Sequence, residues 1–204
     1  MKPIHFTETV LARAIFIGVF ASGILAGAAE PDYSALDRKP VETTAPVGAT
    51  RGLTRGLTRG VTRGAARSYD GTRGMVTIEE SDGVRKELPY VVLPILFKVN
   101  SDELLNAESA ANLRLLAAKL KEAQFSTAHF VVEGHTSTEG TEEHNVDLSR
   151  RRAESILMLL TTEFKVDPSR LSTHGFGPRH PEVTPELTEQ DRQRNRRVLV
   201  VREK

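Results

Sequence analysis

Apolar positions in the second half of the chain follow two different spacings. Short runs rich in β-branched and aliphatic residues predict strands, and two longer stretches with apolar residues every three or four positions predict amphipathic helices. The strands are expected at 95–97, 128–133, 170–174 and 197–201, with helices at 107–123 and from about 145 to Asp167-Pro168. The order β-α-β-α-β-β predicts an α/β (α+β) two-layer domain, with helices packed on a small mixed sheet.

Local signals refine this prediction at several boundaries. Asn106 is suited to cap the first helix, and the apolar face that follows it predicts core packing. Asp82-Gly83 separates two β-rich runs, so residues 75–92 are read as a hairpin extension in which Pro89 favours an edge or a bend. The polar loop at 175–196, between the last two strands, contains three prolines, and we expect no regular element in it.

The first 29 residues have the composition of a secretory signal peptide. Lys2 and Arg13 precede an apolar run at 14–29, and Ala26 and Ala28 supply an A-x-A cleavage pattern. The run is shorter than the roughly 20 residues that a spanning helix needs. An uncleaved membrane anchor is the alternative, and both predict that the bulk of the protein is exported.

Residues 30–74 are poor in large apolar residues and are predicted to form a flexible linker. The linker contains RG[LVA][TA] repeats that place arginines at a period of four, and the glycine of each repeat disfavours a helix by about 1 kcal/mol. The repeat could attract outer-membrane components or anionic envelope polymers, or it could be a solvated spacer. It lacks aromatic residues for base stacking, which argues against nucleic acid. The repeated arginines are Arg51, Arg55, Arg59, Arg63 and Arg67.

Composition narrows the possible functions. The formal net charge is only +1, so no global field indicates a nucleic-acid partner. The chain has no cysteine, which excludes disulfides, thiolate metal sites and thiol nucleophiles. The histidines fit no catalytic or metal-binding motif, so we expect a protein that is not an enzyme and has no metal or cofactor.

Several short sequence blocks follow one another in the second half of the chain. They are Gly134-His135-Thr136, Gly140, Asn145, Leu148-Ser149, Arg152-Ala153, Gly175-Phe176-Gly177 and Asn195-Arg196-Arg197-Val198. Their order and spacing make them more specific together than singly. Together they resemble the OmpA-like C-terminal domain family of peptidoglycan-associated outer membrane proteins, and the resemblance covers residues 93–204.

The resemblance implies a non-catalytic tether that binds diaminopimelate in peptidoglycan stem peptides. It also implies a periplasmic protein that is associated with the cell wall or outer membrane. The exposed end of that diamino acid is a zwitterion, which needs a donor for its carboxylate and an acceptor for its ammonium. Arg152 matches the family arginine that binds carboxylate, and Asn145 and Asn100 match positions that contact ligand. Thr136 and Arg196 complete the expected site.

Ser137 departs from the family pattern, which has an aspartate at this position. Loss of this charged acceptor could cost about 2 to 4 kcal/mol, or roughly 30- to 1000-fold in affinity. Glu139 is a possible substitute acid. Two hypotheses follow: a peptidoglycan-binding tether with a modified site, or a structural or protein-interaction domain that has lost peptidoglycan binding.

Plainer interpretations exist for the expected site residues. Arg152 could form an ion pair with a nearby acid, and Asn145 could simply cap the second helix. Ser137 and Thr136 could close a turn, and Arg196 could fix the entry to the last strand.

Overall fold

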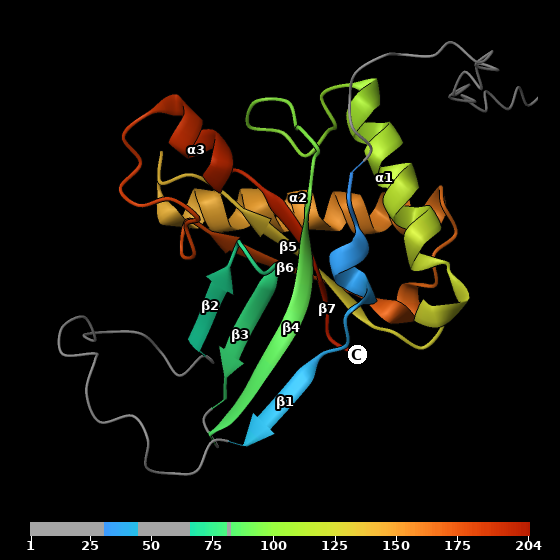
Figure 1. Ribbon diagram of the computed structural model, residues 1–204. Coiled ribbons are helices and arrows are strands. Elements are labelled where there is room, and N and C mark those ends of the chain that lie inside the picture. Colours follow the sequence, from blue (N-terminus) through green and yellow to red (C-terminus); the bar gives the residue numbers. More distant parts are fainter. Residues whose placement is uncertain (1–30, 45–65, 81–82) are drawn as a thin grey trace, which may run out of the picture.

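The computed structural model describes residues 31–44, 66–80 and 83–204. Within these residues, a curled mixed sheet carries two long helices on one face (Figure 1). The strands are β1 (Val41–Thr44), β2 (Ala66–Asp70), β3 (Met75–Glu79), β4 (Val84–Leu93), β5 (Phe130–His135), β6 (Leu171–Gly177) and β7 (Val198–Arg202). The helices are α1 (Ala107–Leu120), α2 (Glu142–Thr162) and α3 (Glu189–Asn195), with short 3-10 turns at Ser34–Asp37, Ala123–Phe125 and Pro168–Arg170.

The sheet has the order β2-β3-β4-β7-β5-β6, and β1 pairs with the N-terminal half of β4. Strands β5 and β6 are parallel and are connected through α2, whereas the other neighbouring strands are antiparallel. This architecture confirms the predicted mixed α+β fold.

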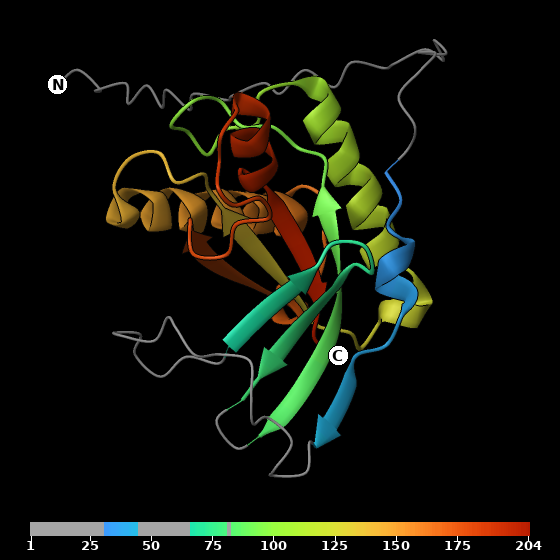
Figure 2. The ribbon, with the colours of Figure 1, turned by 60° about the vertical axis from the view of Figure 1, so that its left-hand side comes forward.

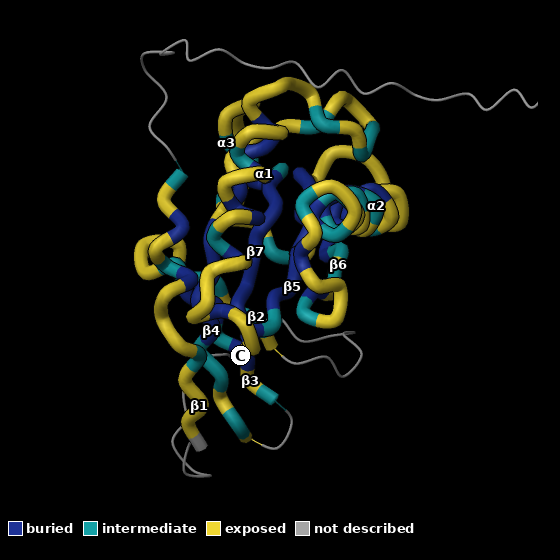
Figure 3. The backbone as a smooth tube through the Cα atoms, turned by 90° about the vertical axis from the view of Figure 1, so that its right-hand side faces the viewer, coloured by how far each residue is buried: buried dark blue, intermediate teal, exposed yellow. Residues whose placement is uncertain are grey.

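The main core lies between the helices and the sheet, where the predicted apolar faces of both helices are buried. Leu113, Leu116 and Leu120 of α1 pack with Ile156 and Leu160 of α2 in this core. Figure 3 shows the buried strands at the centre of the molecule and the exposed faces of the helices outside. Asn106 caps α1 as expected, because its Oδ1 accepts a hydrogen bond from the Ser109 amide at 2.9 Å.

A second, smaller core lies on the other face of the sheet. The β2–β3 hairpin folds over β5 and β7 there (Figure 2). The buried residues of this core include Val76 of β3, Val131 of β5 and Leu199 of β7, and Tyr69 of β2 packs against them. β3 and β4 pair antiparallel in the region where the sequence favoured a hairpin.

The structure differs from the expected 30–74 linker because ordered elements occupy both of its ends. Leu36 is fully buried in the main core, and the Tyr33 hydroxyl donates to the Asn112 carbonyl at 2.9 Å. Arg202 Nη1 donates to the carbonyls of Leu36 at 3.0 Å and Arg38 at 3.1 Å. These contacts rely on isolated residues rather than on an apolar repeat, so the sequence pattern did not reveal them.

The expected signal peptide and most of the arginine repeat, at 1–30 and 45–65, lie outside the described residues. The predictions about them therefore stay predictions. The described strands do locate both ends of the second segment: Thr44 pairs with Val84, and Ala66 pairs with Glu79. Thr44 and Ala66 therefore both lie beside the start of β4. The other end of β4, at Leu93, is about 30 Å away at a rise of about 3.3 Å per residue.

Three expected elements need correction. Residues 95–97 do not extend a strand, because β4 ends at Leu93 before Pro94, and Phe97 forms only an isolated bridge with Leu104. Helix α2 begins at Glu142 rather than near residue 145. The loop expected to be irregular contains α3, which begins after the prolines and is stabilised by a capping box between Thr188 and Asp191.

No helix in the described ranges 31–44, 66–80 and 83–204 is long and apolar enough to cross a membrane.

Candidate ligand site

The ends of β5 and β6 hold α2 at an unusually short distance. A Cβ atom on Gly134 would lie 2.2 Å from the Ser149 carbonyl oxygen, and one on Gly175 would lie 2.4 Å from the Arg150 nitrogen. Only glycine allows this approach of helix backbone to strand backbone. The two glycines thereby fix the part of α2 that carries Arg152.

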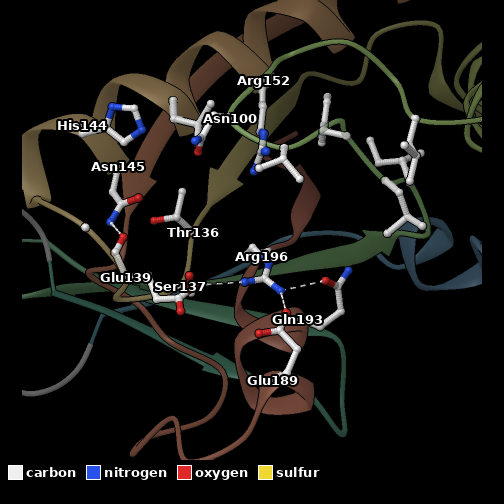
Figure 4. Close-up of a pocket in the computed structure, with 17 residues that line it drawn as sticks. Asn100, Thr136, Ser137, Glu139, His144, Asn145, Arg152, Glu189, Gln193 and Arg196 are labelled. Atoms are coloured by element: carbon white, nitrogen blue, oxygen red, sulfur yellow. Dashed lines mark hydrogen bonds and ion pairs between the residues drawn. The ribbon is translucent and has the colours of Figure 1, made fainter.

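A cavity of about 980 Å³ opens beside this part of α2 (Figure 4). It lies between the start of α2, the loop after β5, the loop at 96–105 and α3. All seven residues that the sequence singled out line it, although they come from four separate segments. They are Asn100, Thr136, Ser137, Glu139, Asn145, Arg152 and Arg196.

Arg152 is buried in the wall of the cavity, with 8% of its surface exposed. Its Nε donates to the Ser101 carbonyl at 3.0 Å and its Nη2 to the Lys98 carbonyl at 3.4 Å, and the guanidinium lies 4.9 Å from the centre of the Phe97 ring. The expected ion pair with a nearby acid is absent from the described part of the chain. Burial, and then the positive charge of Arg196, lower the pKa of Arg152.

The other inner residues of the cavity are neutral. Thr136 and Ser137 are each 4% exposed, and the buried Thr136 hydroxyl oxygen has no hydrogen-bond partner among the described residues. Asn145 is 5% exposed, and its Nδ2 donates to the Glu139 carbonyl at 2.7 Å. Asn145 lies within α2 and holds the preceding loop through this hydrogen bond. The N-cap residue of α2 is Thr141 rather than Asn145.

The outer rim of the cavity carries paired charges. Glu139 lies 3.4 Å from Arg192 and 3.6 Å from Arg196, measured between side-chain oxygen and nitrogen atoms. Glu189 of α3 pairs with the same two arginines. Hydrogen bonds from Arg192 and Arg196 lower the pKa of Glu189. Arg196 therefore faces the cavity and joins the loop at Glu139 to α3.

A hydrogen-bond network holds the loop after β5 in place. The Glu186 carboxylate accepts the Thr138 amide at 3.0 Å and the Thr138 hydroxyl at 2.7 Å. Asn195, which is fully buried, donates to Glu186 and accepts the Glu182 amide at 2.7 Å. The end of α3 thus fixes the backbone beside Ser137.

The sequence analysis missed the contribution of α3 to the cavity. Glu189 and Gln193 line it from this helix, and His144 lines it from the first turn of α2. The prolines at 178–185 suggested an irregular loop, but the capping box at Thr188 and Asp191 could have revealed the helix. The apolar part of the lining comes mostly from the 95–105 segment and includes Ile95, Leu96, Phe97, Val99 and Leu105.

Comparison with known proteins identifies the domain. Residues 96–196 match the OmpA family. Outer membrane porin F of Pseudomonas aeruginosa is 33% identical over 112 residues, which are 55% of this chain and 31% of that protein. The peptidoglycan-associated lipoprotein of the same species is 35% identical over 86 residues, which are 42% of this chain and 50% of that protein. The chain therefore carries an OmpA-like domain.

A solved structure shares the fold. The C-terminal domain of Helicobacter pylori MotB superposes with a TM-score of 0.50 at 20% identity, over 56% of this chain and 84% of that one. The chain spans about a third of the length of the first curated relatives that it matches. These relatives are named as outer-membrane or peptidoglycan-associated proteins rather than as enzymes.

Proposed function

We propose that the OmpA-like domain binds peptidoglycan stem peptides and tethers the envelope to the cell wall without catalysis. Arg152 carries this proposal. Burying a charge without a close counter-charge is costly. Arg152 has no ion-pair partner among the described residues and, of the acids, feels only the longer-range charge of Asp102, so its guanidinium is suited to an external carboxylate. Its Nε and Nη2 hold backbone carbonyls, and Nη1 is available to a ligand.

The neighbours of Arg152 support a polar ligand of the stem-peptide kind. Asn100, Asn145 and the two hydroxyls at 136 and 137 supply donors and acceptors for amide groups. Glu139, the acid that the sequence offers in place of the family aspartate, lies on the outer rim and is paired with Arg192 and Arg196. The relative named peptidoglycan-associated lipoprotein makes peptidoglycan the first ligand to test.

The alternative is an OmpA-like structural or protein-interaction domain that has lost peptidoglycan binding through Ser137. The two functions differ in how they depend on Arg152. A tether needs its guanidinium for ligand, whereas an interaction domain needs it only to hold the 96–105 loop through Lys98 and Ser101.

Sedimentation of the full-length protein with purified peptidoglycan sacculi tests the proposal. We expect Arg152→Ala to weaken binding by roughly 30-fold or more, because a charge-assisted hydrogen bond to carboxylate is lost. Arg150→Ala is the matched control, since Arg150 lies on the same helix and pairs with Asp147 and Glu154 outside the cavity. No binding by the unaltered protein, or equal binding by both variants, would contradict the tether.

A further inference from the structure

The charges of the cavity separate into an inner and an outer group. Thr136, Ser137, Asn145 and Arg152 are all more than nine-tenths buried, and their formal charge sums to +1. The outer acids are far more exposed, since the side chains of Glu139 and Glu189 retain 62% and 65% of their accessible surface. The inner cavity therefore contains one cation and no anion.

The outer acids do not supply that missing anion to the inner cavity. Arg192 and Arg196 both lie within ion-pair distance of Glu139 and of Glu189, so these four side chains together are formally neutral. Consider a ligand whose carboxylate is bound to Arg152 and whose ammonium group lies next to that carboxylate. The ammonium would face hydroxyl groups inside the cavity and neutralised acids on the rim. Its desolvation would be poorly compensated.

A neutral amide nitrogen fits the same position better. An amide N–H needs one acceptor and no counter-charge, and a serine or threonine hydroxyl supplies such an acceptor. Thr136 lines the cavity, and its buried hydroxyl oxygen has no hydrogen-bond partner within the described chain. The Ser137 hydroxyl lies at the adjacent position, where an aspartate would have required a cation.

Acylation of the nitrogen also requires space for the acyl chain, and the surface next to the cavity provides it. A second hollow of about 460 Å³ shares Ile95, Leu96, Gln193 and Arg196 with the first. It continues past Leu93 and Pro94 toward Glu182 and Arg194. The two hollows therefore adjoin along these four residues, and the second hollow is the nearest space for a substituent that leaves the inner cavity.

From this arrangement we infer that the inner cavity recognises an N-acylated amino acid, with its carboxylate on Arg152 and its amide N–H on the hydroxyls of Thr136 and Ser137. This inference rests on the proposed function, because it specifies which group of the stem peptide enters the site. Two parts of peptidoglycan have this chemistry: a diamino acid whose side-chain amine is cross-linked, and the C-terminal residue of a stem peptide.

Binding of small probes to the full-length protein, measured by calorimetry, separates these possibilities. The probes are diaminopimelate, its N,N′-diacetyl derivative and N-acetyl-D-alanine. We expect diacetyl-diaminopimelate to bind about 10-fold more tightly than diaminopimelate, because no ammonium is desolvated beside Arg152. Comparable binding of N-acetyl-D-alanine would identify a peptide C-terminus as the source, and binding of the diacetyl probe alone would identify the cross-link.

Ser137→Asp sharpens the test, because it should reverse the preference in favour of free diaminopimelate. Ser172→Asp is the matched control: Ser172 is exposed on β6, five residues before Gly177, and should leave the preference unchanged. Tighter or equal binding of free diaminopimelate by the unaltered protein, together with sacculus binding, would overturn this inference and leave the tether intact. Failure of sacculi and of every probe to bind would overturn both.

Discussion

Two buried charged side chains on different sides of the molecule differ in whether the chain supplies a counter-charge. Glu133 of β5 is fully buried in the β2–β3 region and has its counter-charge from Arg67, together with a hydrogen bond from the Tyr69 hydroxyl at 2.8 Å. Burial opposes its ionisation, yet His135, Arg67 and Tyr69 hold the pKa of Glu133 below its usual value. Arg152, at the cavity, has no ion-pair partner among the described residues, and its guanidinium contacts backbone carbonyls and an aromatic ring.

The difference separates a structural charge from a candidate binding charge. A buried ion pair that is complete within the chain fixes one element against another, as Arg67 fixes β2 over β5. A buried cation without an acid lowers stability by itself, and binding of an anion recovers that cost. The comparison therefore predicts a large loss of stability when Arg67 is replaced by an apolar residue of similar length, and little change when Arg152 is replaced in the same way.

The largest effect is expected at the complete pair. Arg67→Met should lower the free energy of unfolding by about 3 kcal/mol, because Glu133 would remain buried without its partner. Urea denaturation followed by circular dichroism measures this change. The double variant Arg67→Met/Glu133→Leu should recover most of the loss, and a double variant as unstable as the single one would contradict the assignment.

A pH effect of similar size is expected beside the same pair. His135 stacks on Phe176 and meets the Tyr69 ring edge-to-face, and neither of its ring nitrogens is hydrogen-bonded within the described residues. Burial lowers the pKa of His135 to about 4. The facing charged and titratable groups are Glu133, His180 and Arg197. The unfolded chain binds a proton near pH 6.5 and the folded chain only near pH 4. Stability is therefore complete above about 6.5 and decreases as the pH falls to about 4, by roughly 3 kcal/mol.

Denaturation at a series of pH values measures this slope. His135→Phe should flatten it, since phenylalanine keeps the ring contacts and binds no proton. His144→Gln, which changes an exposed histidine on α2, is the control and should leave the slope in place. A slope that survives His135→Phe would assign the pH effect to other groups.

The smallest effect is expected at Arg152. Arg152→Met should change the free energy of unfolding by less than about 1 kcal/mol, because the loss of two backbone hydrogen bonds is offset by removal of an unpaired buried charge. The same denaturation assay applies. A loss of stability as large as that of Arg67→Met would mean that the Arg152 guanidinium is a structural element. The distinction between a structural charge and a binding charge would then fail.

The sequence predicted the elements that depend on repeated spacing. The leucines of α1 and the apolar face of α2 recur every three or four residues, and the cap at Asn106 is a local signal, so these features were visible. The cavity residues lie in four segments, and spacing alone would not have grouped them. Their grouping came from the family resemblance, and the structure places them around one cavity.

Other features depend on contacts between distant residues and could not be predicted. Arg67 looked like one more arginine of the repeat, and only the fold places it beside Glu133, 66 residues later. Leu36 is a single apolar residue among polar ones and gave no periodic signal, although it is fully buried. Helix α3 was missed because the prolines before it outweighed its capping box.

The position of Leu36 and β1 changes how this chain can be divided. Strands β1 and β2 flank residues 45–65 and are each paired with the rest of the sheet. A protease cut within 45–65 would break the covalent chain but leave both fragments held through β1, Leu36 and Arg202. A truncated protein that starts at residue 75 would instead lack β1, β2 and Leu36, and would expose apolar surface of the main core. The smallest unit for expression should therefore begin near residue 31.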